Sequence, residues 1–328
     1  MASPNQAGKA IRLLNILGPF FGLFLVIFLF SLSPTVRPSF LTGANAKIIL
    51  TQTVIVATGT LGMTIIIVSG GIDLSVGSIV ALTSVVCALA LDKGRSPVTA
   101  ALLTIAMGAT VGLINGSVIG ALRMMPFIVT LGMMGVGRGA AKWLSDSQTV
   151  NPPDNTLNNI MAISEPDHLF PVPNGVWITL ALAVIMAVVM RSTVFGRYIF
   201  AIGANEAAAR LSGIRVQLHK TLIYVVAGIF FGIAGLMQFS RLTQGDPTVA
   251  IGLELDIIAA VVIGGASLSG GSGSILGSLI GALIMAVLRN GSNQMGWPTY
   301  VQEIIIGVVI IIAVGLDKLR QTSMKSAS

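Results

Sequence analysis

Long apolar runs, separated by short polar segments, dominate the sequence. A helix that crosses a bilayer needs about 20 mostly apolar residues, whereas a half-buried strand would alternate apolar with polar positions. Most of the runs reach that length and do not alternate, so the pattern predicts an all-α membrane protein. The runs without any charged residue are Leu13–Val36, Ile48–Ile72, Leu74–Leu91, Ser96–Leu122, Leu169–Met190, Thr221–Ser240 and Ile257–Leu288.

The runs and their polar boundaries predict about ten transmembrane helices in one domain, residues 1–328. The first run follows Lys9 and Arg12 and exceeds the length of a signal-peptide core, so we expect it to remain as a helix. An even number of spans would bring both ends of the chain to one side of the membrane. The predicted spans are 14–33, 48–69, 74–91, 98–122, 125–144, 172–190, 221–240, 252–268, 273–289 and 301–316.

Composition agrees with a membrane location and excludes a soluble protein. Hydrophobic residues make up 54% of the chain and charged residues 9%, with a mean hydropathy of +0.91. Soluble domains contain about 25% charged residues. The net charge of +7 would suggest nucleic acid for a soluble chain, but basic cytoplasmic loops account for it here. We therefore expect membrane lipid, and no nucleic acid, as a partner.

Charge differs between the two longest connections, and the difference predicts the orientation. Segment 145–171 contains Asp and Glu but no Lys or Arg, whereas 191–220 contains five basic residues against Glu206. Because basic loops stay on the cytoplasmic side, we predict that 145–171 lies outside and 191–220 inside. Both termini would then be cytoplasmic.

Two glycine-rich corners resemble each other and divide the chain into halves, 14–144 and 172–316. Gly70–Ser78 and Gly264–Ser274 both follow the pattern Gly-Gly-x-polar-Leu-Ser-x-Gly. Each lies where an inward helix would turn back outward, which is typical of an internal repeat. Chance similarity between glycine-rich turns explains the match equally well. In either case we expect the corners to act as pivots, with Gly70, Gly71, Ser75, Gly264, Gly265, Ser269 and Gly270 as the pivot residues.

No catalytic, metal-binding or nucleotide-binding motif is visible. His168 and His219 lie in connections on opposite sides, and Cys87 lies in an apolar run where it would serve for packing. The glycines of 270–274 are not followed by the Gly-Lys-Ser/Thr that holds phosphates and magnesium. If transport depends on ATP, the ATPase must be another chain, and this chain binds no cofactor.

The inner connection contains a segment that predicts a short helix over 206–212. Asn205 is a suitable N-cap, Glu206 favours the first turn and pairs with Arg210 one turn on, and Gly213 is a suitable stop. The segment is either a solvated loop or a rigid helix for docking a partner. Its candidate docking residues are Asn205, Glu206, Ala207, Ala208, Arg210, Leu211, Gly213 and Ile214.

Several polar residues fall inside or beside the predicted spans. Asp73 is either a helix N-cap or a functional intramembrane carboxylate. Asn115, Ser75, Ser78 and Thr130 would line a polar path or bond neighbouring helices. Arg138 needs a partner in its span, and Glu254 and Asp256 are the candidates for a structural ion pair.

Five stretches in order along the chain resemble the sugar permeases of bacterial ABC importers, the ribose-type family. Met124-Met125 and Leu253 depart from the usual family pattern without removing the resemblance. The five stretches are Ser69–Ser78, Gly112–Gly116, Pro126–Gly132 with Arg138-Gly139, Glu206–Ile214 and Gly252–Ser274.

The resemblance implies an inner-membrane permease that works by alternating access with several partners. These are a cytoplasmic sugar-type ATPase that holds ATP and Mg, a periplasmic sugar-binding protein and a second permease copy, with a homodimer favoured. In the family, the loop that matches 205–214 docks into the ATPase. The partner binding protein would set the substrate, so the sugar or polyol remains open.

Other transport classes fit less of the sequence. An ion-coupled secondary transporter needs ionisable groups at mid-membrane, and those here lie mostly near helix ends. A passive channel leaves the five stretches unexplained. A permease for branched-chain amino acids, from the same fold family, is a further alternative.

Overall fold

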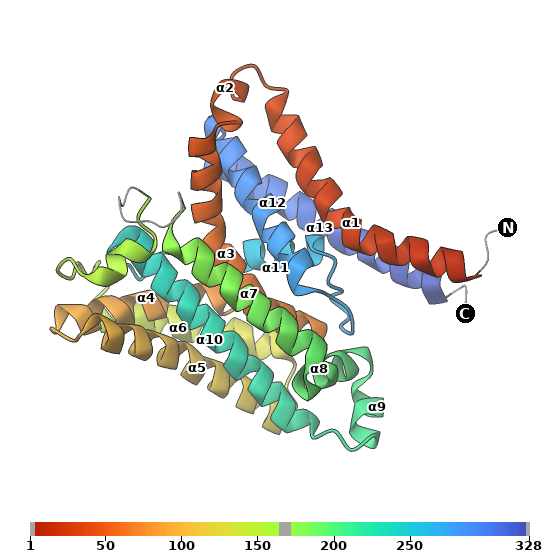
Figure 1. The fold of residues 1–328 in the computed structure, drawn as a ribbon. Helices are drawn as coiled ribbons and strands as arrows, with labels where there is room; N and C mark the ends of the chain where they lie inside the picture. The colour runs from red at the N-terminus through yellow and green to blue at the C-terminus, as the bar shows by residue number, and fades with distance from the viewer. Residues whose placement is uncertain (1–3, 164–171, 326–328) are drawn as a thin grey trace.

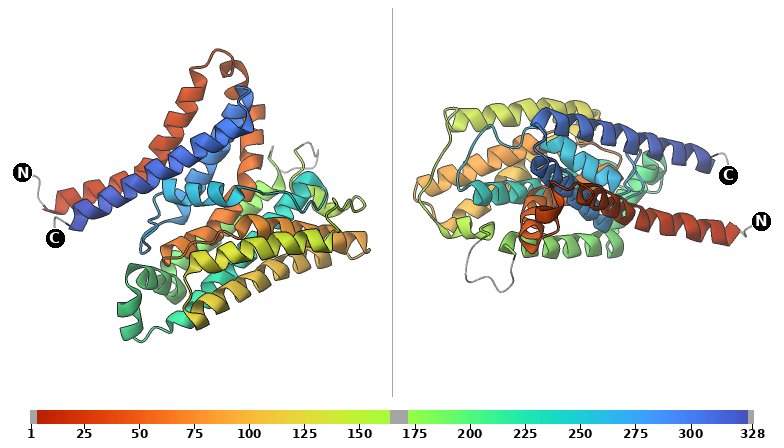
Figure 2. Two further views of the ribbon diagram at one scale, coloured as in Figure 1. Left: turned by 180° about the vertical axis from the view of Figure 1, so that it is seen from behind. Right: turned by 90° about the horizontal axis from the view of Figure 1, so that it is seen from above.

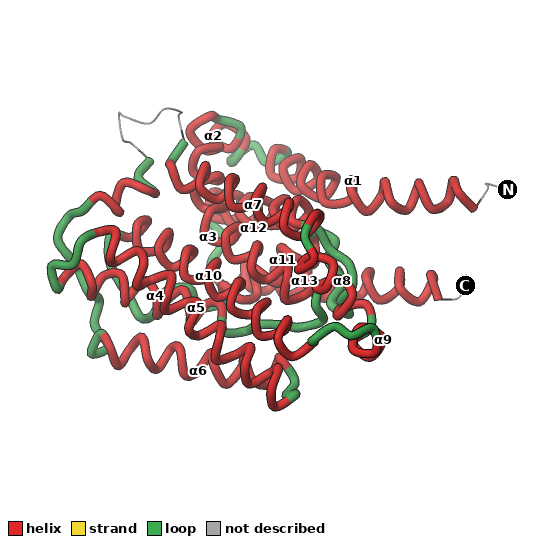
Figure 3. Tube along the Cα trace, turned by 60° about the horizontal axis from the view of Figure 1, so that its bottom comes forward, coloured by secondary structure: helices red, strands yellow, loops and turns green. Residues whose placement is uncertain are grey.

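A computed structural model describes residues 4–163 and 172–325, and these residues form helices and loops without a strand (Figure 3). Residues 164–171, with Glu165, Asp167 and His168 of the predicted outer connection, lie outside the described part. The helices are α1 (Pro4–Ser31), α2 (Arg37–Phe40), α3 (Gly43–Val68), α4 (Val76–Asp92), α5 (Pro97–Leu122), α6 (Pro126–Leu144), the 3-10 helix η1 (Thr156–Ile160), α7 (Asn174–Ser192), α8 (Val194–Ala204), α9 (Glu206–Leu211), α10 (Val216–Leu242), α11 (Leu253–Ile263), α12 (Ile275–Gln294) and α13 (Thr299–Lys325).

Each predicted span coincides with a helix, although several ends differ. In the described residues, α3, α5, α7, α10 and α12 are long and apolar enough to cross a membrane. The helix predicted over 252–268 is present, but its predicted end is wrong, because α11 stops at Ile263 before Gly264 and Gly265. Eleven residues make a helix of about 16 Å, roughly half the hydrocarbon thickness.

The inner connection contains one helix more than predicted. Residues 194–204 form α8, for which the sequence analysis predicted no element. Thr193 caps its start by accepting a hydrogen bond from the Gly196 amide at 3.1 Å. The segment is apolar on one face and packs against α7, α9, α10 and α3, so tertiary contacts stabilise a helix that two internal glycines disfavour.

Helix α3 lies at the centre of the molecule (Figures 1 and 2). It contacts α10 on one side and α11 and α12 on the other, and α4, α5 and α6 extend the layer on the α10 side. Residues 54–68 of α3 are all buried. A helix that is apolar around its whole circumference belongs in such an interior, which explains why α3 is not amphipathic.

Helices α5 and α10 pack with their backbones in close approach. Glycine recurs every fourth residue in α5, and α10 presents Gly228 and Gly232 to it. A Cβ on Gly116 would lie 2.7 Å from the Cα of Thr221, and one on Gly232 would lie 3.0 Å from the Cα of Ile105. Small residues at such crossings allow membrane helices to meet, and any larger residue would separate the pair.

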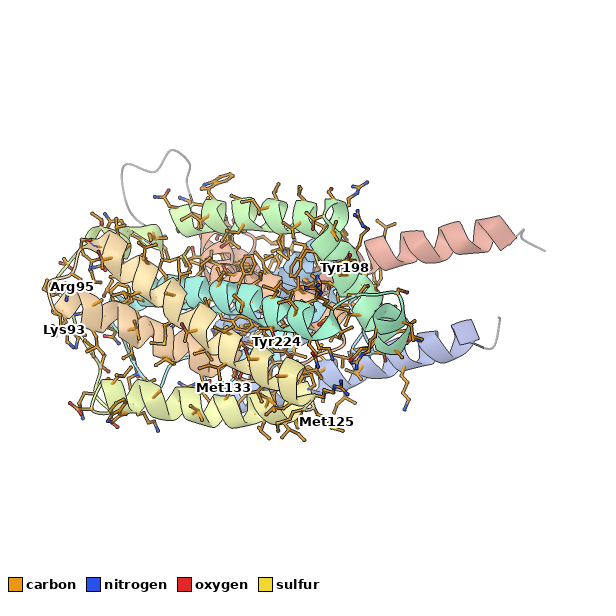
Figure 4. The ribbon with its side chains drawn as sticks, turned by 90° about the horizontal axis from the view of Figure 1, so that it is seen from below. Lys93, Arg95, Met125, Met133, Tyr198 and Tyr224 are labelled. Atoms are coloured by element: carbon orange, nitrogen blue, oxygen red, sulfur yellow. The ribbon has the colours of Figure 1, made fainter. Side chains whose placement is uncertain are left out.

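The molecule has two distinct ends along the long helices. The α4–α5 turn, marked by Lys93 and Arg95, lies at the opposite end from Met125 and Tyr198 (Figure 4). The first end also contains the loop after α6, and the second contains α8 and α9 (Figure 1). The beginning of α1 and the end of α13 both project on the side of α8 and α9 (Figure 2).

Candidate functional site

Helix α9 is short, but both of its ends are capped. The Asn205 side chain accepts a hydrogen bond from the Ala208 amide at 3.0 Å. At the other end, the Gly213 amide donates to the Arg210 carbonyl and the Ile214 amide donates to the Ala209 carbonyl, each at 3.1 Å. Gly213 has φ +85°. This is the left-handed conformation that a C-terminal cap with these two hydrogen bonds requires. The predicted helix and both of its caps are confirmed.

Glu206 ties α9 to α10 as well as to its own turn. Its carboxylate accepts from Arg210 at 2.9 Å, as predicted, and also from Lys220 of α10 at 2.6 Å. Partial burial raises the pKa of the Glu206 carboxyl, but the hydrogen bonds and charges of Lys220 and Arg210 outweigh burial and hold that pKa below its ordinary value. Glu206 is therefore ionised at neutral pH and fixes the orientation of α9.

The outward face of α9 is available to a partner. Leu211 is 90% exposed, and Ala207 and Ala208 beside it are exposed as well. Ala209 faces inward and packs with Ile202 and Val216. The helix is thus held by its inner face and presents small and apolar side chains on its outer face.

The end of α8 meets both glycine-rich corners. A Cβ on Gly203 would overlap the Val68 carbonyl oxygen at the end of α3 and would lie 2.6 Å from the Gly271 nitrogen. One on Gly270 would lie 3.0 Å from the Cα atoms of Gly203 and Gly70. The Gly271 amide donates to the Val68 carbonyl at 2.8 Å. The two corners, which are about 200 residues apart in the sequence, therefore form one junction with α8.

The first corner also contains a buried polar cluster. The Asp73 carboxylate accepts from the Ser75 amide at 2.7 Å and from the Ser75 hydroxyl at 2.5 Å. The Asn115 side chain of α5 donates to that hydroxyl at 3.1 Å. Because α4 begins only at Val76 and Ser75 holds its N-cap position, Asp73 closes a turn three residues before the helix and is not the N-cap that we considered.

Two further helices contact this corner. The Thr130 hydroxyl of α6 donates to the Ile72 carbonyl at 3.2 Å and accepts from the Leu74 amide at 3.1 Å. Tyr224 of α10 packs under Gly71, and its buried hydroxyl has no hydrogen-bond partner in the described part of the chain. Of the predicted polar residues, Asp73, Ser75 and Asn115 thus come together in one place.

Arg138 does not form the expected ion pair. Its guanidinium donates to the carbonyl oxygens of Pro247 at 2.7 Å and Val249 at 2.6 Å. Glu254 and Asp246 contribute attraction from farther away. These bonds give the half-buried guanidinium two acceptors in place of an acid, and they hold the loop 243–252 against α6.

Asp256 pairs instead with Arg289 of α12, which the sequence analysis did not select. Arg289 contacts the carboxylate with Nη2 at 2.6 Å and Nε at 2.8 Å. The pair forms part of the wall of a cavity of about 290 Å³ between α3, α10, α11 and α12. A second hollow of about 370 Å³ shares Gln52 and Arg241 with it.

Two loops are joined at the end of the molecule that contains the α4–α5 turn. The Val150 amide donates to the Gly245 carbonyl at 2.8 Å, and the Gly245 amide donates back at 2.9 Å. The Ser240 hydroxyl of α10 accepts from the Met161 amide at 3.0 Å. The loops 145–163 and 243–252 therefore form one surface above the cavity.

Residues 45–314 match the family described as branched-chain amino acid transport system / permease component. The chain belongs to this permease family. Over 296 residues it is 39% identical to the ribose import permease protein of Escherichia coli (strain K12), covering 90% of this chain and 92% of that protein. Over 303 residues it is 43% identical to the ribose import permease protein of Bacillus subtilis (strain 168), covering 92% of each.

The relatives extend beyond ribose proteins. The L-arabinose ABC transporter permease protein of Azospirillum brasilense is 35% identical over 303 residues, 92% of this chain and 88% of that protein. The resemblance that five short stretches indicated is confirmed. The permease is a transport component and not an enzyme. No solved structure matches it significantly.

The sequence analysis missed the polar lining of the cavity and the role of Gly203. Gln52, Gln238 and Arg289 are single polar residues inside or at the end of apolar runs, and no local pattern distinguishes them. Gly203 has no special backbone angle, so only the fold reveals its crowding. In the described residues, no three His, Cys, Asp or Glu side chains group as a metal site requires.

Proposed function

We propose that the permease moves a monosaccharide or related polyol across the bacterial inner membrane by alternating access. It would receive the sugar from a periplasmic binding protein and would be driven by a cytoplasmic ATPase that holds ATP and Mg. The observation that carries the proposal is the ABC-type family match, with relatives named for ribose, arabinose and allose. A cavity with a polar lining between the helices supports it.

The topology proposed for the permease has ten crossings and cytoplasmic termini. The helices α1, α3, α4, α5, α6, α7, α10, α11, α12 and α13 correspond to the crossings. The short α11 would need the flanking loop 243–252 and the corner 264–274 to complete its crossing. The common side of α9, the start of α1 and the end of α13 supports cytoplasmic ends.

In this orientation α9 docks on the ATPase and transmits its motion. Closure of the ATPase around ATP would move α9, and Glu206 would carry the movement into α10 through Lys220. The same displacement would reach both corners through Gly203, so that Gly70 and Gly270 act as pivots around one junction. Their positive φ values, +83° and +84°, suit glycine alone.

The joined loops 145–163 and 243–252 form the docking surface for the binding protein. Their hydrogen bonds support a common surface, and it stands above the cavity that would accept the released sugar. A second permease copy, forming a homodimer, would complete the membrane part. Both halves, 14–144 and 172–316, contribute a corner to the shared junction.

Reversing the charge of Glu206 tests the docking role. In the complete transporter, Glu206→Arg should lower sugar uptake about tenfold while ATP hydrolysis continues, because α9 loses both ion pairs and repels Lys220 and Arg210. Arg191→Glu, an equal reversal at the end of α7, is the control. Uptake by Glu206→Arg equal to that of the wild type, at equal protein amount, contradicts the role.

The family description also names branched-chain amino acids, which gives a second candidate substrate. Ligand binding to the periplasmic protein encoded beside the permease separates the two. D-Ribose, D-allose or L-arabinose binding supports the proposal, and binding of L-leucine without any sugar overturns it.

A further inference from the structure

A hollow of about 220 Å³ lies where the turn between α5 and α6 meets α9 and the start of α10. It is at the end of the molecule marked by Met125 (Figure 4), which the proposed topology places on the cytoplasmic side. Three basic side chains line it, namely Arg123 from the turn, Arg210 from α9 and Lys220 from α10. Among the described residues of the lining, Glu206 is the one acid. The fold thus gathers an excess of positive charge in one place.

The pairing with Glu206 leaves most of this positive charge available. Glu206 accepts one hydrogen bond from Arg210 at 2.9 Å and one from Lys220 at 2.6 Å. A guanidinium has five N–H donors and an ammonium group has three, so both side chains keep donors for another acceptor. Arg123 has no hydrogen bond or ion pair with another described residue. Because one carboxylate does not balance three cations, the hollow favours a second anion.

The rim of the hollow is apolar. Leu122 at the end of α5 is 66% exposed, Met125 in the turn is 71% exposed and Ile128 in α6 is 54% exposed. Leu131 and Val136 continue this exposed apolar surface along α6. Basic and apolar side chains meet in this way at the boundary between lipid headgroups and acyl chains. An acyl chain fits along this face of α6, whereas a soluble protein domain stays outside the membrane.

A lipid phosphate is the anion that fits this arrangement. Basic pockets between transmembrane helices on the cytoplasmic side bind the headgroups of anionic lipids, and the arginine fork matches the oxygens of a phosphate. The volume of about 220 Å³ lies below that of pockets for drug-sized ligands. Resting on the proposed orientation, we propose that this hollow binds the phosphate of an anionic phospholipid from the inner leaflet through Arg123, Arg210 and Lys220.

A headgroup in the hollow also helps to hold the docking helix. Arg210 and Lys220 already join α9 to α10 through Glu206. A phosphate that accepts from both of them and from Arg123 adds the α5–α6 turn to the same network. The position of α9, and with it the coupling to the ATPase, therefore depends on the lipid.

Tryptophan quenching by brominated lipid tests the site in the full-length permease. Phe127→Trp places a reporter beside the hollow, at a position that is 49% exposed, and subtracting the signal of the unaltered protein removes its natural tryptophans. The vesicles are phosphatidylcholine in which about one lipid in five is phosphatidylglycerol, and bromine on the phosphatidylglycerol should quench the reporter beyond that share. Bromine on phosphatidylcholine should quench only in proportion to its content.

Two arginine variants locate the effect. Arg123→Gln should lower the affinity for phosphatidylglycerol about fivefold, the effect of one basic side chain beside an anionic headgroup. Arg197→Gln is the control, because Arg197 is exposed on α8 at the same end of the molecule and does not line the hollow. Quenching in proportion to lipid content, or equal effects of the two variants, overturns the inference.

Other anions are separated by competition. Displacement of the brominated phosphatidylglycerol by inorganic phosphate would assign the hollow to a soluble phosphate. Loss of the excess quenching when the ATPase assembles would assign it to an acidic surface of the ATPase. Either result overturns the lipid site.

D-Ribose uptake by the complete transporter in the same vesicles is the second arm. Uptake per ATP hydrolysed should rise with phosphatidylglycerol in the wild type and in Arg197→Gln, but not in Arg123→Gln. Wild-type uptake that is independent of phosphatidylglycerol overturns the influence on α9. Excess quenching without D-ribose uptake in any lipid supports the site and overturns the transport proposal.

Discussion

Gly203 shows how much one missing side chain can determine in this permease. It is an ordinary helical residue by its backbone angles, yet the Val68 carbonyl and the Gly271 amide occupy the space where a Cβ would lie. Backbone atoms cannot rotate away as a side chain can, so a methyl group here must displace α8 from the corners.

We therefore expect Gly203→Ala to destabilise the protein by about 2 kcal/mol, in the range of overpacked interiors. Gly18→Ala, where no atom lies within 4 Å of the added Cβ, should change stability by about 0.5 kcal/mol or less. The measurement is the fraction of purified protein that stays monodisperse after heating. Equal heat resistance of the two variants would show that α8 tolerates a wider junction.

The Asp256–Arg289 pair gives a second test at this scale. Asp256→Ala leaves Arg289 without its acid, and the loss of one partner from a buried pair costs about 3–5 kcal/mol. Because the Arg289 side chain is 34% exposed, we expect the lower part of that range. Arg289→Gln in addition to Asp256→Ala should restore about 1 kcal/mol or more, measured by the same heating assay. Strictly additive losses would argue against an energetic pair.

These residues also show why side-chain partners escape sequence reasoning. Arg138 was recognised as a charge that needs a partner, with Glu254 and Asp256 as candidates, and the need for a partner was correct. The partner of Arg138 is a pair of backbone carbonyls. Every residue has a backbone carbonyl, so the sequence does not indicate which ones Arg138 would contact. Whether Asp256 pairs with Arg138 or with Arg289 depends on how α6, α11 and α12 are rotated about their axes and how closely they pack. A single sequence does not define either property.

At the scale of elements, local signals predicted α9 well because its stability is local. Asn205, the Glu206–Arg210 spacing and Gly213 all lie within nine residues, and each performs the predicted function. Helix α8 was missed because it is held by packing against α7, α10 and the distant α3, and such packing leaves no local signal in the sequence. Packing also explains the early end of α11. The chain turns at Gly264, which lies close against the backbone of Gly277, although the apolar run continues past this point.

The N-cap of α9 can be tested separately from its charges. Asn205→Ala removes the acceptor of the Ala208 amide and should cost about 1 kcal/mol. Amide exchange in 205–214 should then accelerate about fivefold, the factor that corresponds to this loss. Asn205→Asp keeps a capping oxygen and should exchange like the wild type. Unaltered exchange in Asn205→Ala would mean that the packing of Ala209 alone holds the helix.

At the scale of the whole molecule, the ten predicted spans were enough to locate ten helices but not their packing. Hydrophobicity reports which segments prefer lipid or an interior, and it therefore predicted positions along the chain. The central place of α3 and the meeting of both corners depend on contacts between segments hundreds of residues apart. Two basic residues depart from the cytoplasmic bias of basic loops, because Lys93 and Arg95 lie at the end proposed to face outward.

The orientation can be measured by cysteine labelling. In intact cells, Gln148→Cys in the loop after α6 should react with a reagent that does not cross the membrane. Ser212→Cys after α9 should react only once the cells are permeabilised, because the ten-crossing topology places it inside. The native Cys87 is buried and gives the background. Reaction of Ser212→Cys in intact cells would reverse the proposed orientation.

Helix α10 has a consequence of its own, because one rigid element reaches from end to end. Its 27 residues make a rod of about 40 Å, which begins just after α9 and carries Gln238 and Arg241 near its far end. Its glycines pack it closely against α5, and Lys220 near its start is paired with Glu206 of α9. If α9 docks on the ATPase as proposed, α10 is the element through which a displacement of α9 would reach the opposite end of the molecule.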